Sequence, residues 1–394
     1  MLCSFSIIQP GRHKYADKCV LFWHQEKVYP DHIKDNIIRL SLGIQTIMST
    51  FSDEPVSTIA CDSFSLVYHI TNGIIFVLCL SIPASNTHIT YIAHQLLQQT
   101  SALLHFRYAD ITVSDLSLYT SSLVSNLILP NLSNILSCFP GFRSLRLSEK
   151  LFLGYECFLS RLVYSSSFTL PVCPSAIFHY DRLVHSQLTS RDNFITSLFL
   201  KQLISEKSIA MTHTSVHDVK VFDVPVFLSG SCSKCNSEKH NLILIQTGPL
   251  SLFLFTPIIN STDFVLTLEN FAAEIVAHCS SQLLYFSSKF SGTAVDSVSS
   301  AITFNSDRSL IDGTIKTNSK FFGPALVKRR KEFESTHEKR VICSEKLSTS
   351  EYFYAEKIGS QELYLLLNYS GNSLIELDEL IATCKRGISA SHNL

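Results

Sequence analysis

The chain has 394 residues, 46% of them hydrophobic, which is enough for two or three domains that each bury a core. Its 32 Lys and Arg residues nearly balance 33 Asp and Glu residues, so the formal net charge is -1. This balance excludes a global field that would attract nucleic acid or an anionic membrane, and any charge-driven contact must be local.

The first predicted unit begins with two strand-like segments, CSFSII and CVLFWH. A helix is then predicted from Pro30-Asp31, with Asp31 as its N-cap. Two apolar stripes lie on opposite faces of this helix, and Ile38 with Leu42 forms the smaller one. We expect the main stripe to pack on the unit's own sheet and the smaller stripe to face a partner. The main stripe consists of Ile33, Ile37, Leu40, Ile44, Ile47 and Phe51.

Two further strands, from Phe64 and from Ile74, are predicted to form a hairpin around Asn72-Gly73. Helices are predicted from Ile92 and from Leu116, the latter bent or split at Pro130. A helical stretch around residues 149–164 leads out of the unit. The order of sheet, helix, sheet and helices predicts an α/β sandwich in which helices cover a largely antiparallel sheet.

The second unit, from about Ser175, repeats this order with a hairpin, a helix from near Ser190 and three strands within 219–255. A long helix is predicted over 267–290. Residues 293–319 are rich in Ser, Thr, Asp and Asn and are interpreted as a surface linker. A reduced third unit then contains the strand ELYLLLNY and the helix SLIELDELIATCKR. The predicted boundaries are 1–165, 172–292, 293–319 and 320–394.

No segment has the roughly 20 apolar residues that a membrane-spanning helix needs. The apolar run 73–83 is shorter, and the run 241–259 is broken at Gln246 and Gly248-Pro249. Both runs are interpreted as buried strands. The N-terminus lacks the basic and apolar regions of a secretory signal, so we expect a cytoplasmic protein.

The 12 cysteines are expected to be reduced and mostly buried, because the cytosol disfavours disulfides. Cys232 and Cys235 have the spacing of a zinc-binding pair, with His240 nearby as a third ligand. A structural zinc site normally needs four ligands and no second pair follows, so a polar loop is the favoured interpretation. His213 and His217 are four residues apart but lack the glutamate of a zinc protease helix.

Sequence patterns of a phosphate-binding loop, a dinucleotide-binding turn and a nucleophile elbow are missing. The spacing of Ser, His and Asp residues singles out no catalytic triad. We therefore expect a protein that is not an enzyme, needs no cofactor and acts through its surfaces.

One dense basic run stands near the C-terminal third, and three interpretations of it stay open. It is a solvated helix face, a patch that contacts anionic lipid, or a nuclear-import-like sequence. The first interpretation is favoured, and lipid binding comes second. The run consists of Lys328, Arg329, Arg330 and Lys331.

Three segments in chain order together resemble the tri-longin-domain family, which includes the Ccz subunits of Mon/Ccz complexes, the Hermansky-Pudlak light-ear protein and inturned. VLFWHQEKVYPDHIKDNIIRLSLGIQTIMSTFS resembles the start of the family's first longin domain, and SAIFHYDRLVHSQLTSRDNFITSLFLKQL the start of its second. QELYLLLNYSGNSLIELDELIATCKRG is similar to the end of the third. The resemblance implies three longin-type α/β sandwiches in tandem, with a short third one.

The resemblance implies that the chain is a subunit of a guanine-nucleotide exchange factor for a Rab GTPase. Its partners would be a Mon-type tri-longin subunit and the Rab protein, at late endosomal or vacuolar membranes. Such exchange needs no acid, base or nucleophile, because the factor only has to bind the nucleotide-free GTPase better than the loaded one. The resemblance places the partner contacts on the first helix and the following strand. These positions are Ile38, Leu42, Phe64, Leu66 and Tyr68.

A different class of function also fits these patterns. Longin modules can serve only as docking surfaces, which would make the chain a non-catalytic adaptor or tether in vesicle traffic. An interpretation of the three strand residues as ordinary core also stays open.

Overall fold

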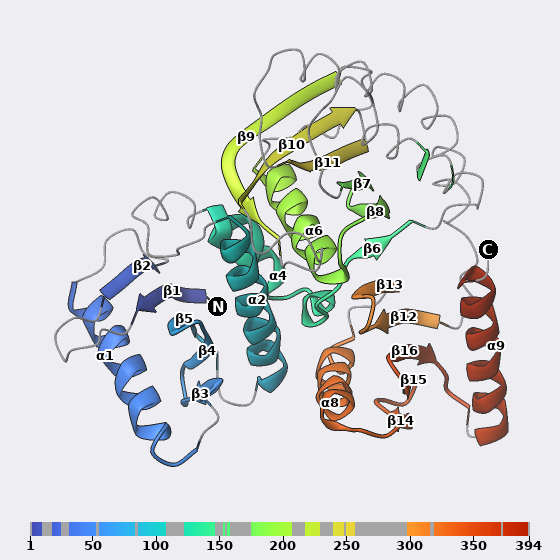
Figure 1. Ribbon diagram of the computed structural model, residues 1–394. Helices are drawn as coiled ribbons and strands as arrows, with labels where there is room; N and C mark the ends of the chain where they lie inside the picture. The colour runs from blue at the N-terminus through green and yellow to red at the C-terminus, as the bar shows by residue number, and fades with distance from the viewer. Residues whose placement is uncertain are drawn as a thin grey trace. The chain divides into compact units, whose positions relative to one another are not determined.

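The computed structural model describes residues 2–9, 18–24, 31–52, 55–82, 86–107, 122–145, 153, 156–157, 175–206, 217–228, 239–247, 250–256, 298–315, 319–371 and 373–392. The chain divides into two compact units, Met1–Pro140 and Gly141–Leu394. Three antiparallel-rich sheets with helices against them make the fold a mixed α/β one (Figure 1), which confirms the predicted class.

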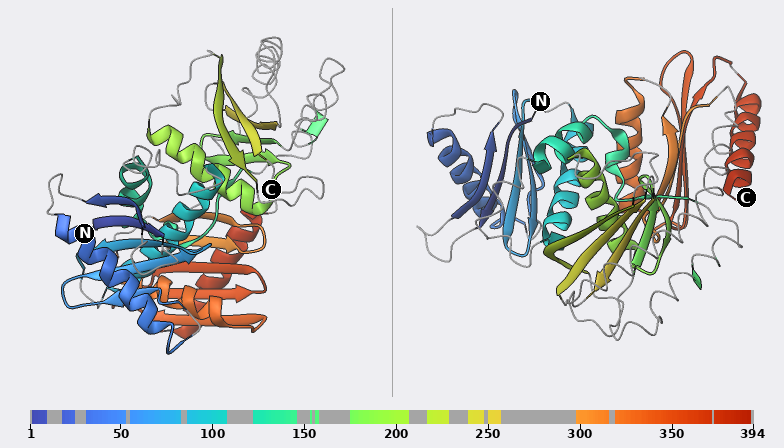
Figure 2. Two further views of the ribbon diagram at one scale, coloured as in Figure 1. Left: turned by 60° about the vertical axis from the view of Figure 1, so that its left-hand side comes forward. Right: turned by 90° about the horizontal axis from the view of Figure 1, so that it is seen from above.

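The first unit has a five-stranded sheet in the order β2-β1-β5-β4-β3. Its strands are antiparallel neighbours throughout. Helices α1 and α2 lie on opposite sides of this sheet (Figure 2). The elements in chain order are β1 (Leu2–Gln9), β2 (Lys18–His24), α1 (Asp31–Met48), β3 (Thr58–Ala60), β4 (Ser65–Thr71), β5 (Ile74–Leu80), α2 (Thr87–Arg107), η1 (Leu123–Ile128), α4 (Leu129–Asn131) and η2 (Ile135–Cys138).

The β4–β5 hairpin forms at the predicted Asn72-Gly73 turn. Both residues have positive φ, 50° and 74°. Thr71 pairs with Ile74 across this two-residue loop. Asparagine and glycine tolerate that conformation, which suits the right-handed twist of the flanking strands. The helix predicted from Leu116 is described from residue 122 onward, and Pro130 lies near the start of the short α4 that follows a π-helical turn.

The second sheet has the order β6-β8-β7-β11-β10-β9 and is antiparallel except for the β6–β8 pair. Thr189 caps α6, because its Oγ1 accepts a hydrogen bond from the Asp192 amide at 3.1 Å. The predicted apolar face of α6 is buried. The elements are β6 (Arg143–Ser144), β7 (Ser175–His179), β8 (Arg182–Ser186), α6 (Ser190–Ser205), β9 (His217–Phe227), β10 (Lys239–Thr247) and β11 (Leu250–Thr256). The buried positions on α6 include Ile195, Leu198, Phe199 and Leu203.

The third sheet has the order β13-β12-β16-β15-β14, with antiparallel neighbours throughout. On one face, Phe322 and Phe333 of α8 pack against Phe353 and Tyr364. On the other face, α9 contributes Leu377, Ile381 and Cys384 to a separate core cluster. The elements are β12 (Val298–Asn305), β13 (Leu310–Ile315), α8 (Phe322–Ser335), β14 (Arg340–Lys346), β15 (Glu351–Ile358), β16 (Gln361–Asn368) and α9 (Leu374–His392).

The linker predicted for 293–319 is wrong over residues 298–315, which form β12 and β13. With this hairpin the third module contains two strands, a helix, three strands and a final helix, and is not reduced. Composition misled the prediction because Ser and Thr alternate with apolar residues here, and such alternation also builds a half-buried strand.

The three modules share one topology. In each, a hairpin, a helix and three strands give a sheet in which the fifth strand lies between the first and the fourth. The helix predicted over 267–290 lies outside the described residues, and the one around 149–164 is described only at residues 153 and 156–157.

Candidate functional site

The five residues expected to face a partner lie in or against one core cluster of the first module. Leu66 and Tyr68 on β4 are each 1% exposed. The cluster also includes β1 and β5 residues, among them Ile8 and Val77. Ile38, Leu42 and Phe64 pack against this cluster as partly buried neighbours. Ile38 and Leu42 therefore attach α1 to its own sheet, and their assignment as partner-facing residues is wrong.

The opposite side of α1 carries an exposed apolar surface. We call Leu40, Ile47, Met48 and Phe51 the outer stripe. Their exposed fractions are 44%, 58%, 38% and 80%. Leu40 and Ile47 are seven residues apart, and Phe51 follows four residues later in the turn that ends the helix, so the side chains follow one helical face. Several large apolar side chains together on one surface indicate an interaction site.

The equivalent helix of the third module has a different outer surface. Its exposed positions include Lys328, Lys331 and Glu334, which are polar and charged. Helices α1 and α8 occupy the same place in the topology, so the fold itself does not demand an apolar outer face. The outer stripe is therefore a property of this sequence at α1.

The basic run on α8 does not act as one surface. Arg329 forms ion pairs with Glu332 at 2.6 Å and with Glu345 at 3.0 Å. Arg330 is 4% exposed. Lys328 and Lys331 are exposed. Because Arg330 is buried, it belongs neither to a solvated helix face, the favoured interpretation, nor to a patch that contacts lipid, the second one.

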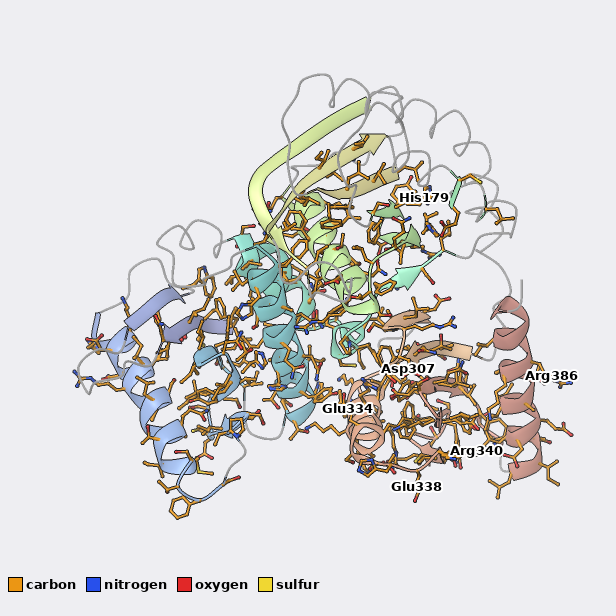
Figure 3. The ribbon with its side chains drawn as sticks, in the orientation of Figure 1. His179, Asp307, Glu334, Glu338, Arg340 and Arg386 are labelled. Carbon is orange, nitrogen blue, oxygen red and sulfur yellow. The ribbon has the colours of Figure 1, made fainter. Side chains whose placement is uncertain are left out.

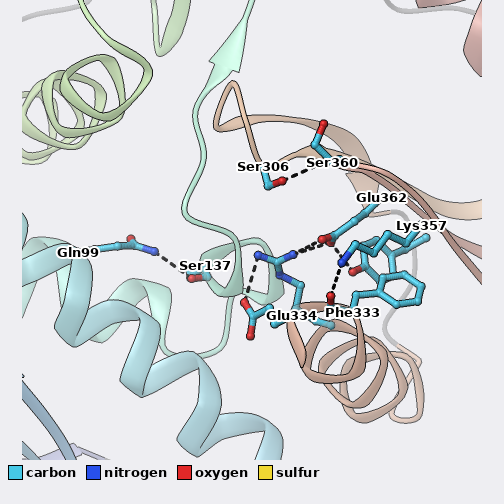
Figure 4. Close-up of polar contacts among 10 residues, drawn as sticks. Gln99, Ser137, Ser306, Phe333, Glu334, Lys357, Ser360 and Glu362 are labelled. Carbon is cyan, nitrogen blue, oxygen red and sulfur yellow. Dashed lines mark hydrogen bonds and ion pairs between the residues drawn. The ribbon is translucent and has the colours of Figure 1, made fainter. Parts of the chain in front are cut away.

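Arg330 lies in a polar network beneath α8. Its guanidinium group pairs with Glu362 on β16 at 2.5 Å and with Glu334 at 3.2 Å, one turn further along the helix (Figure 4). The Tyr364 hydroxyl donates to Glu362 at 2.6 Å. The guanidinium carbon also lies 4.5 Å from the centre of the Phe304 ring. Because Arg330 bonds to Glu334 on its own helix and to Glu362 on β16, it connects α8 to the third sheet.

His69 on β4 and His94 on α2 lie close together in the first module. The ring centres of His69 and His94 are 6.0 Å apart. Burial, followed by the positive charges that His94 and His105 can carry, lowers the pKa of His69 from 6.5 to about 4. The His69 ring is therefore neutral near pH 7. A neutral ring packed against Phe76 serves as part of the core at this pH.

The described residues hold no group of three or more His, Cys, Asp or Glu side chains suited to a metal ion. Cys232, Cys235 and His213 lie outside the described residues. Within the parts that the structure describes, no helix has the length and apolar character to cross a membrane.

Comparison with known proteins gives no identification. The sequence matches no protein-family model and no curated protein.

Proposed function

We propose that the chain is a tri-longin protein and one subunit of a heterodimeric guanine-nucleotide exchange factor for a Rab GTPase in endosomal or vacuolar traffic. The observation that supports this most is the recurrence of one topology in three modules. The segments that resemble the family contribute β2 and α1, β7 to α6, and β16 to α9. The first two segments therefore lie at the start of the first and second modules, and the last lies at the end of the third module, which is the order that the resemblance implies.

The proposed activity is mechanical. An exchange factor stabilises the nucleotide-free GTPase relative to the loaded one by contacts with its switch segments and magnesium site. The chain would supply rigid surfaces for that purpose, and a partner would complete them. Exposed apolar surface on a module with its own complete core is what such a subunit needs.

The outer stripe of α1 is the proposed contact with the Mon-type subunit, in place of Ile38 and Leu42. Leu40, Ile47 and Phe51 offer apolar area to a partner and leave the sheet side of the helix intact. Burying such side chains on association gains about 25 cal/mol per Å² of apolar surface, before the costs of ordering the complex.

Peripheral membrane attachment is also part of the proposal. Lys328 and Lys331 on the outer face of α8 can approach an anionic surface. Each basic side chain near such a surface contributes about 1 kcal/mol, so two lysines alone would hold the protein only weakly. Stable recruitment would need the assembled complex.

A nucleotide-release assay tests the proposal. The purified heterodimer is added to a panel of Rab proteins loaded with fluorescent GDP, and release is started with excess unlabelled GTP. We expect faster release from one Rab protein, and slower release when the complex carries Ile47→Asp and Phe51→Asp.

The same assay tests the adaptor alternative. Binding to a Rab protein without faster release, with preference for its GTP form, would contradict an exchange function. Binding to no Rab protein at all would contradict the proposed partner class.

A further inference from the structure

The hairpin end of the second sheet gathers cationic side chains from three separate elements. Arg143 on β6 pairs with Arg182 on β8 in the parallel register. The turn Tyr180-Asp181 joins β7 to β8, and His179 pairs with Arg182 across it. Figure 3 labels His179 at this end of the sheet. Lys201 of α6 lies near this end, because Asp181 and Arg143 both act electrostatically on its amine.

The segment that carries Arg143 is fixed on both sides. The Leu145 amide donates to the Leu183 carbonyl at 2.6 Å, on the β8 side. The Phe142 amide donates to the Ser309 carbonyl at 2.9 Å, on the β12–β13 hairpin. Gly141 packs so closely that an added Cβ would lie 3.0 Å from the Ser309 oxygen. Arg143 is therefore held at this position by the backbones of two sheets.

These cations are not neutralised within the described residues. Arg143, Arg182 and Lys201 are all partly buried. The ion pairs formed between described residues include none of the three. Among the described residues, Asp181 is the carboxylate that acts on Lys201. Partly buried like charges repel one another, and a bound anion would remove that repulsion.

We propose that Arg143, Arg182 and Lys201 form a binding site for a phosphate monoester, whether on a free small molecule or on a lipid headgroup. Two guanidinium forks and an ammonium suit the several oxygens of a phosphate dianion better than a single carboxylate. The site is separate from the outer stripe of α1 and holds whether or not the chain is an exchange-factor subunit.

The pKa shifts of Lys201 and His179 are consistent with an anion bound beside them. Burial, together with Arg143, lowers the pKa of Lys201 although Asp181 acts in the opposite direction. Burial and then Arg182 lower the pKa of His179, which is 5% exposed. Both shifts reflect an environment that disfavours further positive charge. A phosphate group at this place would act in the opposite direction and favour the charged form of Lys201.

Calorimetric titration of the full chain with inorganic phosphate and with a soluble inositol bisphosphate tests the site. We expect binding that weakens about tenfold for each of Arg143→Gln, Arg182→Gln and Lys201→Gln. Lys320→Gln, an exposed lysine ahead of α8, is the matched control and should bind like the parent chain.

A second arm separates the two sources of phosphate. Phosphatidylcholine vesicles with and without a phosphatidylinositol phosphate are sedimented with each variant. Binding to the soluble probes identifies a free ligand, whereas retention only on phosphoinositide vesicles, lost in the three variants, identifies a headgroup. Binding to neither probe nor vesicle, or binding that all three variants keep, would overturn the proposal.

Thermal unfolding of each variant shows whether a loss of binding comes from unfolding of the chain. Because Lys201→Gln removes a desolvated amine next to Arg143, we expect its melting temperature to be unchanged or higher. If that variant fails to fold, Arg143→Gln and Arg182→Gln still decide the question.

Discussion

Arg330 and Glu362 form a buried ion pair, with the arginine Nη1 2.5 Å from one carboxylate oxygen and 2.6 Å from the other. Their side chains are 5% and 4% exposed. A two-pronged contact between desolvated charges is geometrically demanding, and both partners must be present for it to be tolerated. The pair therefore links α8 to the middle of the third sheet.

Removing one member of this pair should destabilise the third module. We expect Glu362→Gln to lower the free energy of unfolding by about 3 kcal/mol, because it leaves the Arg330 charge buried without its main partner. Urea denaturation followed by circular dichroism measures the change. Lys328→Gln, on the exposed face of the same helix, should change stability by less than about 0.5 kcal/mol. Equal stabilities for the two variants would contradict a structural role for Arg330.

A matched pair of double variants separates the two faces of α1. Ile38→Asp with Leu42→Asp places carboxylates against the core of the first module. This should lower the free energy of unfolding by about 4 kcal/mol, so that the module unfolds. Leu40→Asp with Ile47→Asp places them in solvent and should leave the chain folded. Circular dichroism and limited proteolysis report the folding of each variant.

The partner interaction should follow the opposite pattern. The folded Leu40→Asp and Ile47→Asp double variant should fail to co-purify with the Mon-type subunit, because charges would then face the apolar partner surface. Normal co-purification of this variant would exclude the outer stripe as the contact.

Local signals in the sequence predicted the local structure well. Asn72-Gly73 indicated a hairpin, and the backbone has positive φ at both positions. A helix was predicted from near Ser190, and the Thr189 side chain caps α6 there. In both cases the chemistry of one or two residues dictates the backbone, so no knowledge of distant segments is needed.

The orientation of α1 could not be predicted in this way. The helix carries apolar residues on two faces, and periodicity shows that two stripes exist without showing which one faces the sheet. The larger stripe was expected to be the core side, yet Ile38 and Leu42 pack on the sheet and Ile47 is 58% exposed. Arg330 is a similar case, because its buried partner Glu362 is 32 residues away in the sequence.

Acid should destabilise the first module through His69. The folded state holds its pKa at about 4 against 6.5, so between these values the unfolded chain binds the proton more readily. Stability is therefore complete above pH 6.5 and falls as the pH decreases toward 4. Because His69 is only half-buried, we expect a loss on the order of 1 kcal/mol.

The measurement is the free energy of unfolding of the first module between pH 7 and pH 4. His69→Leu should flatten the part of the pH dependence that belongs to this site, whereas His337→Gln, at an exposed position beyond α8, should not. An unchanged pH dependence in His69→Leu would show that this histidine is not responsible.

Gly313 provides a test of the β12–β13 hairpin in the segment that composition assigned to a linker. It has φ of 157° and pairs with Ile302 of β12. A Cβ at this position would meet the Ala301 carbonyl oxygen and would lie 2.9 Å from the Ile302 Cα. Because both neighbours are backbone atoms, the clash cannot be relieved by a rotamer change, and Gly313→Ala should cost about 2 kcal/mol.

The matched control is Gly43→Ala on the exposed side of α1, where an added Cβ meets nothing within 4 Å. This substitution should stabilise the helix by about 0.5–1 kcal/mol, because alanine loses less backbone entropy than glycine. Hydrogen exchange of the β12 and β13 amides checks the first prediction, and thermal unfolding checks both. If Gly313→Ala were as stable as the parent chain, residues 298–315 would not pair as described, and the third module would lose its first two strands.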